Sequence, residues 1–446
     1  MTFTLATGSE RKSTGSYYTH PELVRGLIES ALVPVMEDRL KQAKEKDAKE
    51  QAILSMTVCD PACGSGHFLL AAARRLGREL AKVRTGEDEP TPEHFHLAVR
   101  DVISHCIYGV DVNPLAVDLC KLALWLEGHW TGKPLSFLDH RIKCGNSLIG
   151  VLNPSVLKDG IPDSAFTPVT GDDKKVAQAF KKRNKEESKG RYLPFSGIDG
   201  DIHQFAAGTH CIDEMVEDTP ADVKRKQQKY EEWRSKPAWW HDWTACNIWT
   251  AAFFAPLTKF DDPAVPTYDK FVRYLEGGHV DSQMEGLAIG LATELKFFHW
   301  TLEFPEVFEN GGFNVVLGNP PWDSLQPEEL TFFATHGDGC IARMSGAKRK
   351  QAITALKKDN PGLLQRWESE KRRIEAPNKF IRESKQLSLT TSGKLNTYSL
   401  FAELSGRLHN AKGYCGVLVP SGIVVDETFS RVDKVCAHSK LPTPSA

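Results

Sequence analysis

Short apolar runs alternate with amphipathic stretches toward both ends of the chain. Five runs are typical of buried strands, and they lie at residues 56–59, 106–111, 141–148, 313–317 and 416–421. Four amphipathic stretches predict helices, at residues 20–32, 67–83, 114–126 and 396–411. Thr19 is the predicted N-cap of the first helix, with Glu22 three residues on, and Gly413 ends the last. Strands that alternate with helices predict an α/β fold with a mostly parallel, doubly wound sheet.

The pattern loosens between residues 153 and 281, and again at residues 326–391, where helices are predicted. The first of these segments contains five tryptophans: Trp233, Trp239, Trp240, Trp243 and Trp249. We interpret them mainly as the small core of a helical insertion. The alternative is a DNA-binding groove in which aromatic and basic side chains alternate. Residues 84–96, polar and with two prolines, are predicted to form a loop.

The first strand runs directly into a glycine turn that precedes a helix. The turn consists of Asp60, Pro61, Ala62, Cys63, Gly64, Ser65 and Gly66. Strand, glycine turn and helix form a ligand-binding unit, because backbone N–H groups face the ligand. Leu69 stands where a dinucleotide site needs a third glycine, and the Lys-Ser/Thr of a Walker loop is absent. The acid Asp60 suits a ligand that carries an amino group.

Three further strands are followed by polar side chains that suit a nucleoside and a planar amine. Asp111 ends the second strand and can accept both ribose hydroxyls, and Asn146 follows the third. The fourth strand ends at Asn319, Pro320, Pro321 and Trp322. The Asn319 amide oxygen and the Pro320 carbonyl can accept hydrogen bonds from an exocyclic NH2, and the rigid prolines hold them in place. Trp322 offers a flat face for an extruded base. We call the residues at the carboxyl ends of these four strands, at 60–66, 111, 146 and 319–322, the first to fourth strand tips. Together they predict methylation of a planar amine.

Composition narrows the class of protein without identifying a partner. The 446 residues suffice for two or three domains, and the net charge of −2 provides no general attraction to phosphates. DNA contact would then need local basic patches, although the clusters at 348–350 and 371–373 are typical of solvated helix faces. The ten cysteines form no CxxC pair, so we expect no metal site and a reducing cytoplasm. No apolar run has the length of a membrane span.

With these motifs placed, the sequence resembles adenine-N6 DNA methyltransferases of the gamma type, which use S-adenosyl-L-methionine. Within that family it is most similar to the large methylases of restriction–modification and phage-defence islands. The motifs that carry the resemblance are residues 16–19, 60–66, 111, 145–148, 319–322, 398–401 and 416–420. The resemblance implies a Rossmann-like class I methyltransferase fold and double-stranded DNA as the substrate. It also implies direct in-line transfer to a flipped base, in a prokaryotic cytoplasm near the nucleoid.

The resemblance also implies residue roles. Tyr18 and Thr19 would close over the methionine part of the cofactor, and residues 60–66 would hold its amino acid. Asp111, with Val112, would bind the ribose, and Asn146, with Ser147, the adenine ring. The family usually has Asp where Asn146 stands. The target base would be held by residues 319–322, with Asn319 also beside the cofactor.

The same resemblance divides the chain into parts. Residues 1–150 would form the N-terminal helix and the cofactor-binding half of the methyltransferase domain, and residues 151–296 a charged, Trp-rich insertion. Residues 297–425 would form the catalytic half, with a helical insertion at 326–391, and residues 426–446 a weakly ordered tail. Family members continue into a DNA-recognition region that these last residues do not match. We therefore expect a C-terminally truncated chain that needs a specificity or defence-complex subunit.

Three alternatives remain open at the level of sequence. Enzymes that methylate the glutamine-N5 of release factors, or guanine-N2 in RNA, also use Asn-Pro-Pro-aromatic tips, although they are shorter. A cofactor-binding subunit without activity is the second alternative. The third is a nuclease site formed by Asp281 with Glu294 and Lys296, a pattern common by chance and set here in a predicted helix.

Overall fold

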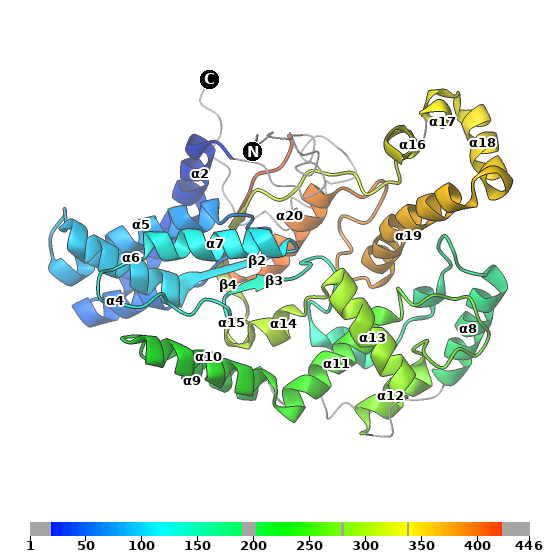
Figure 1. Ribbon diagram of the computed structural model, residues 1–446. Coiled ribbons are helices and arrows are strands. Elements are labelled where there is room, and N and C mark those ends of the chain that lie inside the picture. Colours follow the sequence, from blue (N-terminus) through cyan, green and yellow to red (C-terminus); the bar gives the residue numbers. More distant parts are fainter. Residues whose placement is uncertain (1–18, 190–201, 278–280, 337–338, 422–446) are drawn as a thin grey trace, which may run out of the picture.

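The computed structural model describes residues 19–189, 202–277, 281–336 and 339–421. Its centre is one sheet of five parallel strands in the order β3-β2-β1-β4-β5 (Figure 1). The strands are β1 (Val58–Asp60), β2 (Ile107–Asp111), β3 (Ile142–Cys144), β4 (Phe313–Gly318) and β5 (His409–Val417). The α/β class and the doubly wound parallel sheet predicted from the sequence are confirmed.

Neighbouring strand residues point to opposite faces, and each face has its own hydrophobic core. In β1, Val58 belongs to one core and Cys59 to the other, both fully buried. In β4, Val315 and Val316 divide in the same way. Burial on both faces explains why these strands read as continuous apolar runs rather than as alternating ones.

Helices from the first third of the chain cover one face of the sheet. They are α2 (Pro21–Leu27), η1 (Ile28–Leu32), α3 (Val33–Gln42), α4 (Lys46–Leu54), α5 (His67–Thr85), α6 (Pro92–Cys106) and α7 (Pro114–Glu127). Helices α5 and α7 confirm two predictions within two residues. The predicted loop at 84–96 is partly wrong, because α6 begins at Pro92 with Thr91 as its N-cap. Proline at the first helical position lacks only an N–H that would be unpaired there.

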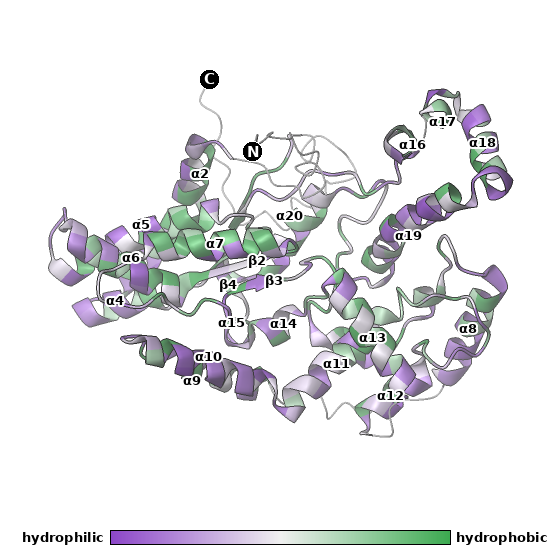
Figure 2. Ribbon diagram, viewed as in Figure 1, coloured by the Kyte–Doolittle hydropathy of each residue, from purple (hydrophilic) through white to green (hydrophobic). Residues whose placement is uncertain are grey.

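The insertion and its neighbours cover the other face (Figure 1). The elements are η2 (Pro154–Asp159), η3 (Asp163–Phe166), α8 (Lys174–Glu187), α9 (Ile202–Asp213), α10 (Pro220–Arg234), α11 (Pro237–Ala251), α12 (Tyr268–Leu275), α13 (Ser282–Leu295), α14 (Trp300–Glu303), α15 (Pro305–Phe308) and α20 (Thr397–Leu408). Figure 2 shows hydrophilic residues along the outer helices α8 and α10 and hydrophobic ones beside the sheet.

Three of the five tryptophans between residues 233 and 249 are core residues, and Trp243 is partly buried against the same core. Trp233, Trp239 and Trp249 are 2–3% exposed, whereas Trp240 is 45% exposed. The core that holds them also contains Cys59 and Tyr108 of the sheet. The core interpretation is therefore confirmed for the three buried side chains, and the insertion shares one continuous core with the sheet.

Buried ion pairs tie the insertion to the third strand. Lys143 of β3 donates to the Glu303 carboxylate at 2.9 Å, and Arg234 of α10 contacts the same carboxylate at 2.8 Å. Burial favours protonation of Glu303, yet Arg234 and Lys143 hold its pKa at about 2. A lysine in a buried strand is tolerated here because its charge is paired.

An arm of helices leaves the sheet after β4 and returns before β5. It consists of α16 (Glu329–His336), α17 (Cys340–Arg343) and α18 (Gly346–Asp359), which pack on α19 (Pro361–Glu383). Its own small core contains Phe332, Phe333, Leu356 and Trp367. In Figure 1 the arm stands apart from the sheet at the upper right.

The boundary between α20 and β5 differs from the one predicted from the sequence. The helix predicted to reach residue 411 stops at Leu408, and β5 starts at His409 rather than near residue 416. Gly413 lies inside β5, where a Cβ would meet the Phe313 carbonyl oxygen at 2.8 Å, so this glycine permits close strand contact instead of ending a helix. Asp281 of the nuclease-like pattern caps α13 through the Gln283 N–H. In the described part of the chain, no helix is long and apolar enough to cross a bilayer.

Candidate active site

The tips of β1 and β4 lie side by side at the carboxyl edge of the sheet. The two strands pair through Val58 with Val315 and Cys59 with Val316. A Cβ built on Gly318 would lie 2.7 Å from Asp60 Oδ1. The structure thus brings the glycine turn and the Asn-Pro-Pro-Trp tip together, where parallel sheets bind ligands.

Backbone geometry in the turn between β1 and α5 depends on two glycines. Gly64 has φ of +52° and Gly66 has φ of +85°, which other residues adopt only with strain. A Cβ on Gly66 would lie 2.7 Å from the sulfur of Cys120, whereas a Cβ on Gly64 would meet no atom within 4 Å. Gly64 therefore leaves open space beside its backbone, which a ligand can approach. Ala62 and Ser65 lie at the same turn, and Cys63 is buried beneath it.

Asp60 is a buried acid at the base of this turn. It is 1% exposed, and its Oδ1 accepts a hydrogen bond from the Ala62 N–H at 2.9 Å. Burial raises the pKa of the Asp60 carboxyl to about 7, and the nearby Asp111 acts in the same direction. A carboxyl poised near neutrality in a crevice marks a functional candidate, because a cationic ligand would favour its ionised form.

Asp111 joins the second tip to the glycine turn. Its Oδ2 accepts from the Gly64 N–H at 2.9 Å, and its Oδ1 accepts from the Asn113 N–H at 2.8 Å. Burial raises the pKa of Asp111, while these two N–H groups and Lys296 lower it. The next residue, Val112, is 49% exposed and presents an apolar surface beside the acid.

The third tip is fixed from two sides. Ser147 donates its hydroxyl to the Pro61 carbonyl at 2.6 Å, which fastens the third tip to the first. Asn146 receives a backbone hydrogen bond from Leu148 on its Oδ1, and its own N–H donates to the Lys296 carbonyl at 2.7 Å. Asp60, Asp111 and Asn146 thus follow three adjacent strands at one edge.

The side-chain amide of Asn319, which follows β4, has a hydrogen-bonded nitrogen and an oxygen without a donor. Its Nδ2 donates to the Thr19 hydroxyl at 3.0 Å, which leaves Oδ1 as the free acceptor. That oxygen is buried and has no hydrogen-bond partner among the described residues. A buried carbonyl without a donor costs about 1–3 kcal/mol, so a donor supplied by a ligand would relieve it.

Thr19 lies opposite Asn319 instead of capping a helix. The N-cap of α2 is His20, whose ring accepts from the Glu22 N–H, so the prediction of Thr19 as the N-cap is wrong. Thr19 is 6% exposed, and its hydroxyl is occupied by the Asn319 amide. Tyr18 lies outside the described residues.

The loop after Asn319 is held by a neighbouring helix. Pro320 is buried, and the Pro321 carbonyl accepts from the Thr397 hydroxyl of α20 at 2.6 Å. That hydroxyl also accepts from the Asp323 N–H at 2.8 Å. Trp322 is 51% exposed, and its indole N–H donates to the Leu418 carbonyl. Its ring is therefore fixed at one end and open to solvent.

Sequence reasoning missed the supporting roles of Lys296 and Thr397. Lys296 ends α13 with φ of +54°, and its Nζ donates to the Val112 carbonyl at 2.7 Å. Lys296 is 184 residues from Val112 in the chain, so no local pattern could reveal this contact. A weak signal for Thr397 existed, since it directly precedes the motif at residues 398–401.

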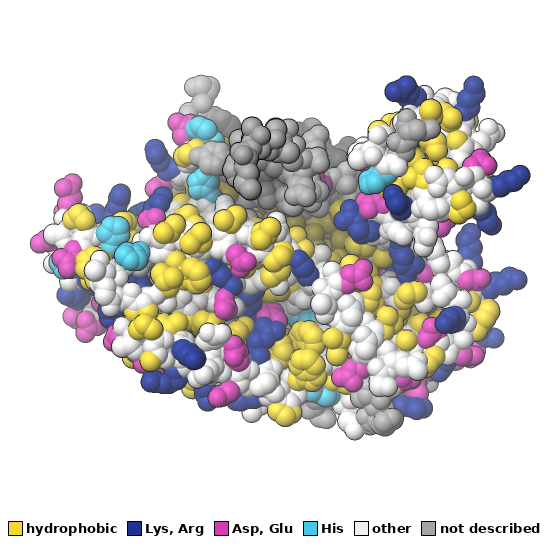
Figure 3. Space-filling view, viewed as in Figure 1, with side chains coloured by type: hydrophobic (Ala, Val, Ile, Leu, Met, Phe, Trp, Pro, Cys, Tyr) yellow, Lys and Arg dark blue, Asp and Glu magenta, His cyan; other side chains and the backbone are white. Residues whose placement is uncertain are grey.

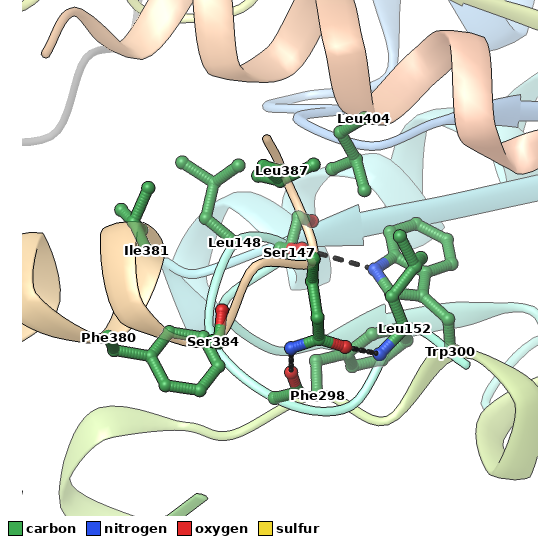
Figure 4. Close-up of a pocket in the computed structure, with 12 residues that line it drawn as sticks. Ser147, Leu148, Leu152, Phe298, Trp300, Phe380, Ile381, Ser384, Leu387 and Leu404 are labelled. Carbon is green, nitrogen blue, oxygen red and sulfur yellow. Dashed lines mark hydrogen bonds between the residues drawn. The ribbon is translucent and has the colours of Figure 1, made fainter. Parts of the chain in front are cut away.

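A small internal cavity of about 20 Å³ lies behind the third tip (Figure 4). Ser147, Leu148, Trp300 and Phe380 help to line it, and Trp300 donates to the Ser147 carbonyl at 3.1 Å. A space of this size holds about one water molecule. The cavity therefore lies among the residues that pack behind the third tip, and it is too small for a substrate.

Asp60 leads to a pH prediction. If its carboxylate binds the amino group of a ligand, the Asp60 contribution to affinity for S-adenosyl-L-methionine should be full only above about pH 8 and half lost at about pH 7, the pKa of this carboxyl. Affinity should fall roughly fivefold from pH 7 to 6, and about tenfold per unit below that, as the carboxyl takes up its proton. Titration calorimetry from pH 5.5 to 8.5 measures this. Asp60→Asn should bind weakly with a flat profile, and a flat profile in the unmodified protein would contradict the assigned role.

Comparisons with known proteins agree with this arrangement. The model of the Eco57I restriction-modification methylase family matches residues 105–337, just over half of the chain. The model of the MmeI DNA-methyltransferase domain matches residues 36–140, which include the glycine turn.

Three relatives show partial similarity. A protein of Methanocaldococcus jannaschii, provisionally named a type II restriction enzyme and methyltransferase, is 23% identical over 71% of this chain and 28% of its own length. The adenine-specific methyltransferase PglX of Streptomyces coelicolor is 30% identical over 26% of this chain and 9% of its own length. DNA methyltransferase A of Bacillus subtilis is 25% identical over 29% of this chain and 15% of its own. The matches thus span less than a third of each relative. The extent of the first family match, together with the sheet and its four tips, places this chain in the Eco57I restriction-modification methylase family.

Proposed function

We propose that this chain transfers a methyl group from S-adenosyl-L-methionine to the exocyclic N6 amine of adenine in DNA, in restriction–modification or phage defence. The observation that carries the proposal is the buried Asn319 Oδ1, an acceptor without a donor at the carboxyl edge of the sheet. An exocyclic NH2 is a donor of suitable size and charge for it.

The residues at the other tips fit the cofactor. Asp60 would hold its amino group, and the open space beside Gly64 would admit its amino-acid part. Asp111 would bind the ribose and Val112 would lie against the purine, with Asn146 and Ser147 at its edge. Thr19 would lie between the methionine part and Asn319. When bound, the cofactor supplies an electrophilic methyl carbon on a sulfonium centre.

The chain's own residues would bind, orient and polarise the target amine. Asn319 Oδ1 and the Pro320 carbonyl would accept its two N–H bonds, which draws the nitrogen lone pair out of conjugation with the ring. Thr397 holds the Pro321 carbonyl, so the loop is fixed before the base arrives. Trp322 would stack on the base, whose extrusion from the duplex costs a few kcal/mol. The proposed transfer is direct and needs no nucleophile from the protein.

Two observations support adenine in DNA over other planar amines. The family to which the chain belongs is one of restriction–modification methylases, and one relative, PglX, is named as adenine-specific. Enzymes that modify glutamine or RNA guanine use a similar tip, so the tip alone does not select the substrate.

Tritiated cofactor distinguishes these substrates directly. Incorporation of label is expected into duplex DNA, as N6-methyldeoxyadenosine after hydrolysis to nucleosides, and not into RNA or a glutamine-containing release-factor peptide. Methylome sequencing of cells that carry the gene would report the target sequence as well. Label in peptide or RNA alone, or binding of cofactor without transfer to any substrate, would overturn the proposal.

A further inference from the structure

The arm formed by α16–α18 carries a net positive charge that is concentrated on α18. Helix α18 has five basic residues and one acidic residue, which gives it a formal charge of +4 in a chain whose total is −2. Figure 3 shows Lys and Arg side chains over this arm at the upper right of the face in view. A concentration of one sign on a single helix attracts a partner of the opposite sign.

Four lysines of α18 are free to meet such a partner. Lys348, Lys350, Lys357 and Lys358 are exposed, and within the described ranges none of them has a carboxylate partner. At about 100° per residue, Lys350, Lys357 and Lys358 lie roughly 100–160° around the helix from the buried Leu356. Lys348 lies about 80° from Leu356, so the four lysines span about half of the helix circumference. Arg349, by contrast, is used within the arm, where it donates to the Met344 carbonyl and faces Glu329 of α16.

The second basic cluster, at residues 371–373, is paired with carboxylates of the protein itself. Arg372 pairs at 2.6 Å with Asp172, whose side chain is fully buried, and Arg373 pairs with Glu370. Lys371 lies 3.6 Å from Glu375. The two clusters look alike in sequence, yet only the cluster on α18 presents unpaired charge.

The arm lies in the chain between the Asn-Pro-Pro-Trp loop and the helix that holds this loop. It follows the Asn-Pro-Pro-Trp loop by six residues, and α19 leads back toward α20, whose Thr397 holds that loop. Phe332, Phe333, Leu356 and Trp367 give the arm its own core, with Trp367 5.0 Å from Phe332 between ring centres. The lysines are therefore displayed on a folded support connected at both ends to the proposed base-binding tip.

We infer that the solvent face of α18 binds the phosphate backbone of the duplex that contains the target base. The inference rests on the proposed action on DNA and adds to it a specific contact surface. The lysine ammonium groups on the solvent face of α18 would bind phosphates independently of base sequence. They would thereby fix the position of the duplex relative to the Asn-Pro-Pro-Trp tip. The basic cluster at residues 348–350, whose composition is also typical of a solvated helix face, thereby has a proposed partner.

The test is the salt dependence of DNA binding by the full chain. A variant with Lys348, Lys350, Lys357 and Lys358 all changed to Ala is compared by fluorescence anisotropy with the unmodified chain, on a labelled duplex between 50 and 300 mM salt. Each phosphate contact contributes about 0.9 to the slope of log K against log salt. We expect the slope to become shallower by about 2–4 and the affinity at 100 mM salt to fall at least about tenfold. Cofactor affinity and melting temperature should be unchanged.

A matched control removes the same charge at the other end of the molecule. Changing Lys41, Lys44, Lys46 and Lys49, at the junction of α3 and α4, to Ala should leave the slope within about one unit of the unmodified value. Equal slopes in the α18 variant and the unmodified chain would overturn the assignment while leaving the proposed function standing. Absence of DNA binding by the unmodified chain would overturn both. Polyglutamate bound as tightly as DNA through the same lysines would instead indicate an acidic protein partner.

Discussion

Asn319→Ala is expected to reduce methyl transfer to DNA by about 100- to 1,000-fold and to change cofactor affinity by no more than a few-fold. The lost group is the buried Oδ1, the acceptor proposed to polarise the target amine. Removing one preorganised hydrogen-bonding group at a reacting centre costs this much in other enzymes. Alanine also frees the Thr19 hydroxyl, which can turn to solvent or to the neighbouring backbone. Single-turnover transfer from tritiated cofactor and titration calorimetry measure the two quantities separately.

The control is an asparagine of the same segment that lies away from the tip. Asn310 precedes β4 at its opposite end, where its Nδ2 donates to the Glu306 carbonyl at 3.0 Å. Asn310→Ala should retain transfer within about twofold, with a similar effect on folding. Normal turnover by Asn319→Ala would show that the tip does not activate the amine. A parallel loss of cofactor binding would instead assign Asn319 to the cofactor.

Trp239→Ala is expected to lower the free energy of unfolding by about 3–5 kcal/mol, the usual cost of replacing a buried large aromatic side chain. Trp239 is 2% exposed, its indole N–H donates to the Leu302 carbonyl, and the Arg234 guanidinium lies 4.3 Å from its ring centre. The same arginine pairs with Glu303. The cavity left by the substitution would therefore also weaken the ion pairs between Glu303, Arg234 and Lys143 that connect the insertion to β3.

The adjacent Trp240 provides the matched comparison. It is 45% exposed and packs mainly against Trp243, with ring centres 5.0 Å apart. Trp240→Ala should change the free energy of unfolding by less than about 1 kcal/mol. Thermal and urea denaturation of both variants, followed by far-ultraviolet circular dichroism, measure the difference. Similar stability for the two variants would mean that Trp239 is not part of the core.

The sequence by itself determined the parallel sheet and the polar residues that gather at its carboxyl edge. Each strand tip is a local pattern, namely an apolar run followed by a turn residue and a polar group, as at Asp60, Asp111 and Asn319. Because parallel strands have their carboxyl ends at one edge of the sheet, predicting the strands also predicts that these side chains lie at the same edge. The glycine turn was equally readable, because a positive φ at Gly64 and Gly66 restricts which residues can stand there.

Only the tertiary structure decided which similar residues have different roles. Trp239 and Trp240 are neighbours in sequence, yet one is buried and the other exposed, because only one side of the N-terminal turns of α11 faces the shared core. The two basic clusters differ because buried Asp172 reaches one and no described carboxylate reaches the lysines of the other. The pKa of Asp60, the anchoring of Val112 by Lys296 and the orphaned Asn319 oxygen all arise from groups far apart in the chain. Burial and long-range contacts set these properties, and no local pattern encodes them.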